Sequence, residues 1–297
     1  MATIDIGRIG IWTGILDAHP AGKAREACQE LEALGVATLW IPETVGRDPF
    51  VAAATYLAAT TTLRLATGIA NIYARDALTM SSCQKTLAEA YPGRFLLGLG
   101  VSHHHLVERV RKHDYSKPLS YMQAYLTEMD AALYMAPKPA DDDCQRVLAA
   151  LGPKMLATAA TQANGAHPYF TTPEHTQFAR QTMGADAFLA PEQMVVVETD
   201  PTKAREIARA AMHVYLRAPN YTNNLVRMGF DASDWTDPAN PSDRVVDAIV
   251  AWGSLDQIKA RVQAHFDAGA DHVCLQALRA DRNVPMDEWR ALAGALN

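Results

Sequence analysis

The chain has 297 residues, of which 49% are hydrophobic and 20% charged, as in ordinary soluble globular proteins. A chain of this length buries about 75% of its unfolded surface, so it needs neither disulfides nor a metal to fold. The formal net charge of −6 argues against a general affinity for nucleic acids or anionic membranes, and we expect a small-molecule substrate as the partner instead.

Short apolar runs alternate with segments of helical spacing through the first hundred residues. We expect strands at residues 9–12, 37–41, 63–69 and 95–99. We expect helices at residues 21–34, 49–60 and 79–90, the first of them ended by Gly35. Four strands about 30 residues apart, alternating with helices, are typical of parallel βαβ units.

The second half continues this alternation less evenly. Further strands are expected at residues 147–151, 165–170, 193–198 and 271–277, with a helix at 154–162. Eight units in about 300 residues favour an α/β fold of the (β/α)8, or TIM barrel, type, with a single domain over residues 1–297. The alternative is an open Rossmann-like sheet, which would need a break in the alternation that the sequence does not show.

Two connections are too long for simple crossovers, and we interpret them as insertions after strands 4 and 7. Residues 103–146 hold an expected helix at 119–135 and a polar loop at 137–143. Residues 199–270 hold expected helices at 201–216, 243–251 and 255–268. Long insertions in a barrel commonly serve as lids or binding loops.

Cysteine spacing and hydropathy bear on the cellular compartment. The four cysteines, at positions 28, 83, 144 and 274, form no C-x-x-C pair, so neither a zinc ribbon nor a redox dithiol is expected. Residues 1–10 show no basic segment before an apolar run, and no stretch approaches the roughly 18 uninterrupted apolar residues of a membrane span. We therefore expect reduced thiols, no signal peptide and a cytoplasmic location.

A run of three histidines follows the fourth strand, and in a barrel the active site lies where strands end. Consecutive side chains point in different directions, so His103, His104 and His105 cannot converge on one ion, and we expect no metal. We favour His103 as a proton donor or acceptor facing the pocket, since histidine titrates near neutral pH. The alternative is a solvated histidine in a loop.

Glycines mark two further strand ends. Gly98 and Gly100 lack the third glycine of a dinucleotide fingerprint, and close approach of the backbone to a flat ligand explains them better. In Leu151-Gly152-Pro153-Lys154-Met155, a helix start after a strand offers free amides, with Lys154 beside them, to an anion or phosphate. The alternative for this segment is an ordinary strand-to-helix turn.

Other residues near strand ends have both a binding and a packing interpretation. After the third strand, Asn71 and Arg75 are able to recognise a ligand. Aromatic residues at such positions are mainly packing residues, and those that could also line the substrate side are Trp12, Tyr73, His167, Tyr169 and Trp252.

In order and spacing, a set of motifs resembles the bacterial-luciferase-like superfamily, and within it the oxidoreductases that depend on the deazaflavin coenzyme F420. The motifs are RIGIW (8–12), LWIPE (39–43), TGIAN (67–71), RFLLGLGVS (94–102), LGPKM (151–155), APEQ (190–193), WGS (252–254) and AGAD (268–271). No single motif is diagnostic, but together they extend over nearly the whole chain.

The resemblance implies a (β/α)8 barrel with F420, or alternatively FMN, lying across the strand ends. It implies a non-proline cis peptide at Gly68–Ile69, in a bulge behind the cofactor ring. It also implies a homodimer, since barrels of this superfamily often dimerise. The implied cofactor-binding residues are Trp12, Gly68, Ile69, Ala70, Asn71, Gly100, Val101, Ser102, Leu151, Gly152, Pro153, Lys154 and Met155.

The chain departs from the family pattern at the catalytic positions. Many relatives place a histidine right after the acidic residue that ends strand 2, whereas Thr44 follows Glu43 here. His103 corresponds to an acid in related sugar-phosphate dehydrogenases, so His103 is the first candidate for the catalytic proton donor or acceptor and Glu43 the second. The resemblance thus implies an F420-dependent oxidoreductase that exchanges hydride with a small organic substrate. An FMN-dependent monooxygenase and a noncatalytic flavin-binding protein are the alternatives.

Overall fold

The computed structural model describes residues 4–296, which build one sheet in which every strand pairing is parallel. Its order is β10-β9-β11-β1-β2-β3-β5-β6-β7-β8, with β4 paired to β5. The strands are β1 (Ile9–Trp12), β2 (Thr38–Ile41), β3 (Arg64–Thr67), β4 (Ala70–Asn71), β5 (Phe95–Gly100), β6 (Arg146–Leu148), β7 (Gly165–Ala166), β8 (Phe188–Leu189), β9 (Glu192–Val196), β10 (Val250–Trp252) and β11 (Val273–Ala277).

The sheet curls back on itself. β8 and β9 lie close together in the chain but near opposite ends of the strand order. Between them, the amide of Ala190 donates to the carbonyl of Ala166 beside β7, and the carbonyl of Pro191 accepts from the amide of Cys274 in β11. This curled parallel sheet fits the expected barrel, whereas an open Rossmann-like sheet would leave its two ends apart.

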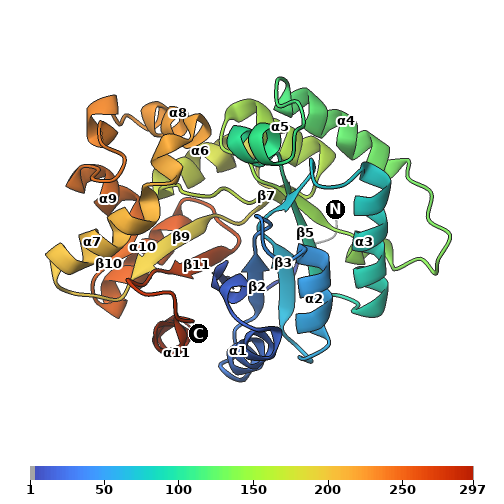
Figure 1. The fold of residues 1–297 in the computed structure, drawn as a ribbon, viewed down its shortest axis with the longest axis horizontal. Coiled ribbons are helices and arrows are strands. Elements are labelled where there is room, and N and C mark those ends of the chain that lie inside the picture. Colours follow the sequence, from blue (N-terminus) through green and yellow to red (C-terminus); the bar gives the residue numbers. More distant parts are fainter. Residues whose placement is uncertain (1–3, 297) are drawn as a thin grey trace.

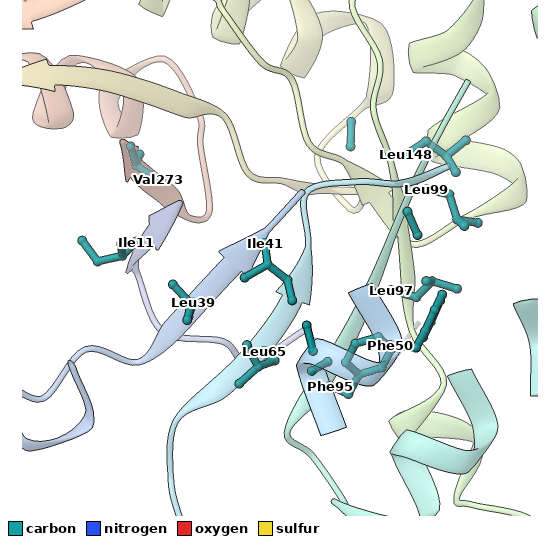
Figure 2. Packing of buried hydrophobic residues seen from close by; sticks show 14 of the residues in the cluster. Ile11, Leu39, Ile41, Phe50, Leu65, Phe95, Leu97, Leu99, Leu148 and Val273 are labelled. Carbon is teal, nitrogen blue, oxygen red and sulfur yellow. The ribbon is translucent and has the colours of Figure 1, made fainter. Parts of the chain in front are cut away.

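Apolar side chains cover both faces of the sheet, as expected for parallel strands flanked by helices. In β2, Leu39 and Ile41 join a cluster that includes Phe50 of α2, so this cluster lies between strands and helices (Figure 2). The intervening Trp40 joins a second cluster with Trp12, which contains no helical residue. Because successive strand side chains point to opposite faces, one short strand contributes to both clusters.

Helices follow most strands and surround the sheet (Figure 1). Six of them begin with proline, which is favoured at the first helical position. The helices are α1 (Ala21–Ala33), α2 (Pro49–Leu57), α3 (Ala77–Ala90), α4 (Pro118–Asp130), α5 (Pro153–Gln162), α6 (Pro173–Met183), α7 (Pro201–Met212), α8 (Pro219–Arg227), α9 (Asp243–Ile249), α10 (Leu255–Asp267) and α11 (Met286–Leu296).

The long connections hold more structure than the sequence predicts. The stretch between β5 and β6 contains a π-helix at His105–Val110 besides α4, and α4 ends at Asp130 rather than at residue 135. Residues 250 and 251, expected to end a helix, instead belong to β10 (Val250–Trp252), because pairing with β9 overrides the helical spacing. The prediction also missed α6, α8 and α11.

Three expectations concern the chain as a whole. All four cysteines are free thiols. Among the helices of residues 4–296, none combines the length and apolar character needed to cross a membrane. The expected domain of residues 1–297 includes residues 1–3 and 297, which lie outside the described part of the chain.

Candidate active site

A cavity of about 400 Å³, within the usual size range of ligand sites, opens at the carboxyl ends of the strands. Ten of the sequence-predicted site residues line it: Trp12, Glu43, Gly68, Ile69, Val101, Ser102, His103, Leu151, Gly152 and Met155. The other predicted residues do not line it: Ala70, Asn71, Gly100, Pro153 and Lys154. His167 and Tyr169 line the cavity as well, whereas Tyr73 and Trp252 do not.

The Gly68–Ile69 peptide bond after β3 is cis, as the resemblance implies. The nearby glycines of β5 pack closely against the protein. A Cβ on Gly98 would lie 1.9 Å from the Thr67 carbonyl oxygen, and one on Gly100 would lie 2.5 Å from Ile69 Cγ1. Gly100 therefore makes room for the Ile69 side chain, which itself reaches the cavity.

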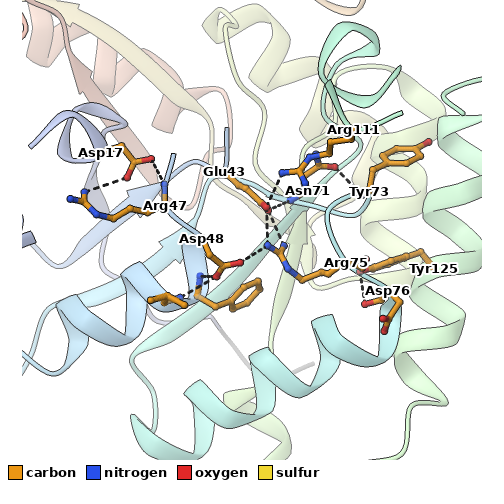
Figure 3. A network of polar contacts seen from close by, with 12 residues as sticks. Asp17, Glu43, Arg47, Asp48, Asn71, Tyr73, Arg75, Asp76, Arg111 and Tyr125 are labelled. Atoms are coloured by element: carbon orange, nitrogen blue, oxygen red, sulfur yellow. Dashed lines mark hydrogen bonds and ion pairs between the residues drawn. The ribbon is translucent and has the colours of Figure 1, made fainter. Parts of the chain in front are cut away.

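Glu43, in the loop after β2, is held by a network of charged and polar groups (Figure 3). Its carboxylate is 5% exposed and accepts two 2.8 Å hydrogen bonds from Arg75. It also accepts from the Asn71 amide at 2.8 Å and from Arg111 at 3.3 Å. Arg75 bonds Asp48 as well. Asn71 and Arg75, predicted as ligand-recognising residues, thus contact the protein, and Glu43 has both oxygens engaged.

The three histidines after β5 diverge, as the sequence predicts. His104 pairs with Glu108 at 2.9 Å on the surface, and His105 is exposed. His103 lines the cavity, and its buried Nδ1 has no hydrogen-bond partner among the described residues. Burial lowers the pKa of His103, while a hydrogen bond with the Asn220 side chain raises it. This ring is therefore the member of the triplet that can contact a ligand.

The amino end of α5 forms another part of the wall. Gly152 is the N-cap of α5 and lines the cavity together with Met155, so the amino end of the helix, with its unpaired amides, lies at the cavity wall. Arg227 of α8 also lines the cavity, and its Nη2 lies 3.7 Å from the position that a Cβ on Gly152 would occupy. Lys154, the predicted cation, is exposed. The guanidinium near this helix start comes instead from the distant connection between β9 and β11.

Residues 215–227, which include the whole of α8, supply the part of the wall that sequence analysis missed. The missed residues are Tyr215, Asn220, Tyr221, Asn223 and Arg227. Their only sequence signal is the position inside a long barrel insertion, a place where binding loops are common. Their packing includes aromatic contacts of Tyr221 with His103 and Tyr169, at centroid distances of 5.5 and 6.1 Å.

Buried polar groups lie beneath this wall. The Tyr169 hydroxyl is 2.7 Å from both Tyr215 Oη and Gln276 Oε1. Glu192 accepts from the Phe170 amide at 3.2 Å, and burial raises the pKa of Glu192 to about 8. Near pH 7 this carboxyl group is therefore mostly protonated.

Fold and site together define an α/β barrel-type protein with a ligand cavity at the carboxyl ends of its strands. The chain belongs to the luciferase-like monooxygenase family, whose model matches residues 8–272. A putative coenzyme F420-dependent oxidoreductase of Mycobacterium tuberculosis is 26% identical over 195 residues. That match covers 56% of each protein, so the chain spans little more than half the length of this curated relative.

Solved structures share the fold over nearly the whole chain. An F420-dependent secondary alcohol dehydrogenase in complex with an F420–acetone adduct aligns with a TM-score of 0.76 at 14% identity, covering 98% of this chain and 99% of the other. The F420-dependent tetrahydromethanopterin reductase of Methanopyrus kandleri aligns with 0.77 at 16%, covering 97% of each. The FMN-bound oxygenating constituent of 3,6-diketocamphane monooxygenase from Pseudomonas putida aligns with 0.72 at 12%, covering 96% and 95%.

Proposed function

We propose that this protein is an oxidoreductase that binds coenzyme F420 in the cavity and exchanges a hydride between it and a small organic substrate. The observation that carries the proposal is the cavity itself, with apolar surface on one side and an anion-compatible helix start on the other. The F420-dependent relative supports deazaflavin over FMN. The FMN-bound structural neighbour makes FMN the alternative cofactor.

The residues present fit such a cofactor. Ile69, Val101 and Trp12 offer apolar surface to a planar ring. The amides at Gly152 and the Arg227 guanidinium suit its side-chain phosphate, because helix amino ends and cations favour negative charge. When bound, the deazaflavin supplies two-electron hydride chemistry and reacts poorly with oxygen.

His103 is the proposed proton acceptor and donor. His103 lines the cavity, its buried Nδ1 has no hydrogen-bond partner among the described residues, and its lowered pKa keeps the ring neutral at pH 7. A neutral ring can accept the hydroxyl proton of an alcohol as hydride leaves the carbon, and return that proton in the reverse direction. Glu43 is a weaker candidate, since Arg75 and Asn71 occupy its oxygens.

Cofactor titration tests the proposal. F420 and FMN are added separately to the protein while ligand or protein fluorescence is followed, and we expect saturable binding of F420. Tight FMN binding without F420 binding would replace the proposal by the FMN alternative. Alcohols, aldehydes and enones are then tested for turnover, because tight binding without any turnover would indicate a noncatalytic flavin-binding protein.

A pair of neighbouring variants tests the role of His103. We expect His103→Ala to bind cofactor normally and to lose at least about 100-fold in turnover, as is typical when a general acid or base is removed. His104→Ala removes an exposed ring from the next position and is the matched control. Full activity of His103→Ala would remove His103 from the mechanism.

A further inference from the structure

His167 lies directly after β7, with its ring at the floor of the cavity. The side chain is 1% exposed, and His167 is among the residues that line the cavity. Its Nε2 has no hydrogen-bond partner among the described residues. The same atom lies 3.1 Å from the position that a Cβ on Gly68 would take, so it is next to the backbone of the cis peptide.

The hydrogen bond of the other ring nitrogen decides which nitrogen carries the proton. His167 Nδ1 is 2.8 Å from the carbonyl oxygen of Ala190, and a carbonyl only accepts, so Nδ1 is protonated. The nearby Cys274 thiol donates to the Pro191 carbonyl and does not alter this assignment. In the neutral ring Nε2 is then a bare acceptor. Burial lowers the pKa of His167 to about 4, so the ring is neutral at pH 7.

His272, in the same barrel interior, is the internal comparison. Its Nδ1 also bonds a carbonyl oxygen, that of Gly7, at 2.7 Å. Its Nε2, however, accepts a hydrogen bond from the Trp40 indole at 3.1 Å. Trp40 also stacks on His167, with ring centroids 4.3 Å apart, which fixes that ring plane. The fold thus supplies a hydrogen-bond donor to His272 Nε2. His167 receives only the stacked face of Trp40, and its Nε2 receives no donor from the described residues.

The donors nearest to the cavity floor are already engaged. The Trp12 indole donates to the Gly68 carbonyl at 3.0 Å. The Tyr169 hydroxyl donates its one proton to Gln276 Oε1 at 2.7 Å, and its oxygen accepts from the Tyr215 hydroxyl at 2.7 Å. A buried acceptor without a partner destabilises the site, so a ligand that supplies a donor at this point gains affinity.

We propose that His167 Nε2 is a fixed hydrogen-bond acceptor for an N–H or O–H group of the molecule bound in the cavity. The identity of that molecule rests on the proposed function. Two sources carry the required chemistry: the imide N–H of a flavin or deazaflavin ring, and the hydroxyl of an alcohol substrate. His167 is in either case a positioning residue, because its ring accepts a hydrogen bond and does not take the proton.

The first test needs no cofactor. In the full chain labelled with ¹⁵N-histidine, we expect the His167 resonances at pH 7 to report a protonated Nδ1 and an unprotonated Nε2. This tautomer should persist from pH 8 to about pH 5, since burial holds the ring neutral. A ring protonated at Nε2, or charged at pH 7, would overturn the proposal whatever the cofactor is.

The second test uses variants that separate the two nitrogens. His167→Asn retains an amide near Nδ1 for the Ala190 carbonyl but removes the acceptor at Nε2, whereas His167→Gln returns an oxygen near Nε2. We expect His167→Asn to weaken binding of the donor-bearing ligand about 5- to 10-fold, the effect of one hydrogen bond, and His167→Gln to recover part of it. His19→Asn is the control, because its unpartnered Nε2 is also buried but does not line the cavity.

The ligands used distinguish the two sources. If the cofactor is the donor, His167→Asn weakens FMN or F420 binding but leaves an N3-methylated flavin unaffected. If the substrate is the donor, cofactor binding is unchanged and KM rises for alcohols but not for the matching carbonyl compounds. Unchanged values in both arms would overturn the inference and leave the proposed function standing. Failure of the unmodified chain to bind F420 or FMN would overturn the proposed function, whereas the tautomer measurement, which needs no ligand, would still test the premise that Nε2 is a free acceptor.

Discussion

We interpret Glu43 as a structural anchor of the segment that follows β3, and replacing it with glutamine tests that interpretation. Its carboxylate, 5% exposed, accepts from Arg75, Arg111 and the Asn71 amide, and the Arg75 side chain is itself only 9% exposed. Glu43→Gln retains the shape and one acceptor oxygen but removes the charge. Arg75 then keeps Asp48 as its remaining acidic partner, at 2.8 Å, and that carboxylate is 45% exposed.

The size of the effect follows from these contacts. Removing one partner of a buried ion pair typically costs about 3–5 kcal/mol, because the other charge stays buried. Since Asp48 still neutralises part of the Arg75 charge, we expect about 2–4 kcal/mol. With an unfolding entropy of about 2.1 cal/mol/K per residue, each kcal/mol lowers the Tm of this 297-residue chain by about 1.6 °C, which gives a decrease of roughly 3–6 °C.

Urea denaturation and thermal melting followed by circular dichroism measure this loss, and cofactor titration of the folded variant accompanies them. Glu89→Gln is the matched control, because Glu89 is exposed on α3 and its substitution should leave Tm within about 1 °C. Normal stability of Glu43→Gln together with lost turnover would refute the anchoring interpretation. Glu43 would then be the catalytic group that sequence analysis ranked second.

Three further predictions concern buried groups. Burial raises the pKa of Glu192 from 4.5 to about 8, so the folded state keeps a proton that the unfolded chain loses. Stability should therefore fall as pH rises through that window, and urea denaturation at several pH values should show Glu192→Gln to be less sensitive. Burial lowers the pKa of His265 to about 3 and of His272 to about 4, so their contribution is full above pH 6.5 and should be lost as pH falls toward 4. Gly100→Ala should cost about 1–3 kcal/mol through the clash with Ile69, and adding Ile69→Ala should recover part of that cost in a double-mutant cycle.

The strand pattern was predictable because parallel strands buried on both faces read as short apolar runs. Trp40 and Ile41 illustrate this. Ile41 joins the cluster between strands and helices, Trp40 joins the cluster that contains Trp12, and both positions are apolar. The strands expected at residues 147–151 and 165–170 correspond to β6 and β7, which end earlier. Several residues that follow β6 and β7 line the cavity instead of pairing with a neighbouring strand. An apolar run in the sequence indicates that its residues are buried. It does not indicate whether they are buried in a sheet or beside a ligand cavity.

The site was predictable only where its residues follow strand ends. His103 and Gly152 are of that kind, because the topology brings all such ends to one side. The partners of Glu43 were not predictable, since Arg75 and Arg111 lie on different loops and local sequence does not reveal which charge meets which. Arg227 was missed for another reason: α8 lies in a segment rich in asparagine, a poor helix former, and its docking depends on tertiary packing.

The cavity wall is therefore formed by residues that belong to different hydrophobic clusters. The strand-end loops belong to the sheet and its surrounding cluster, whereas Tyr221 packs in a different cluster together with Met194, Leu225 and Val246. Some polar residues that line the cavity do not follow a strand, and most of these belong to residues 215–227. Substitutions in the cluster that contains Tyr221 should reshape the wall formed by residues 215–227 while leaving Ile69 and His167 in place. Differences in substrate preference among related chains are then expected to arise mainly in the connection between β9 and β11, since loops carried on a rigid scaffold can vary without loss of the fold.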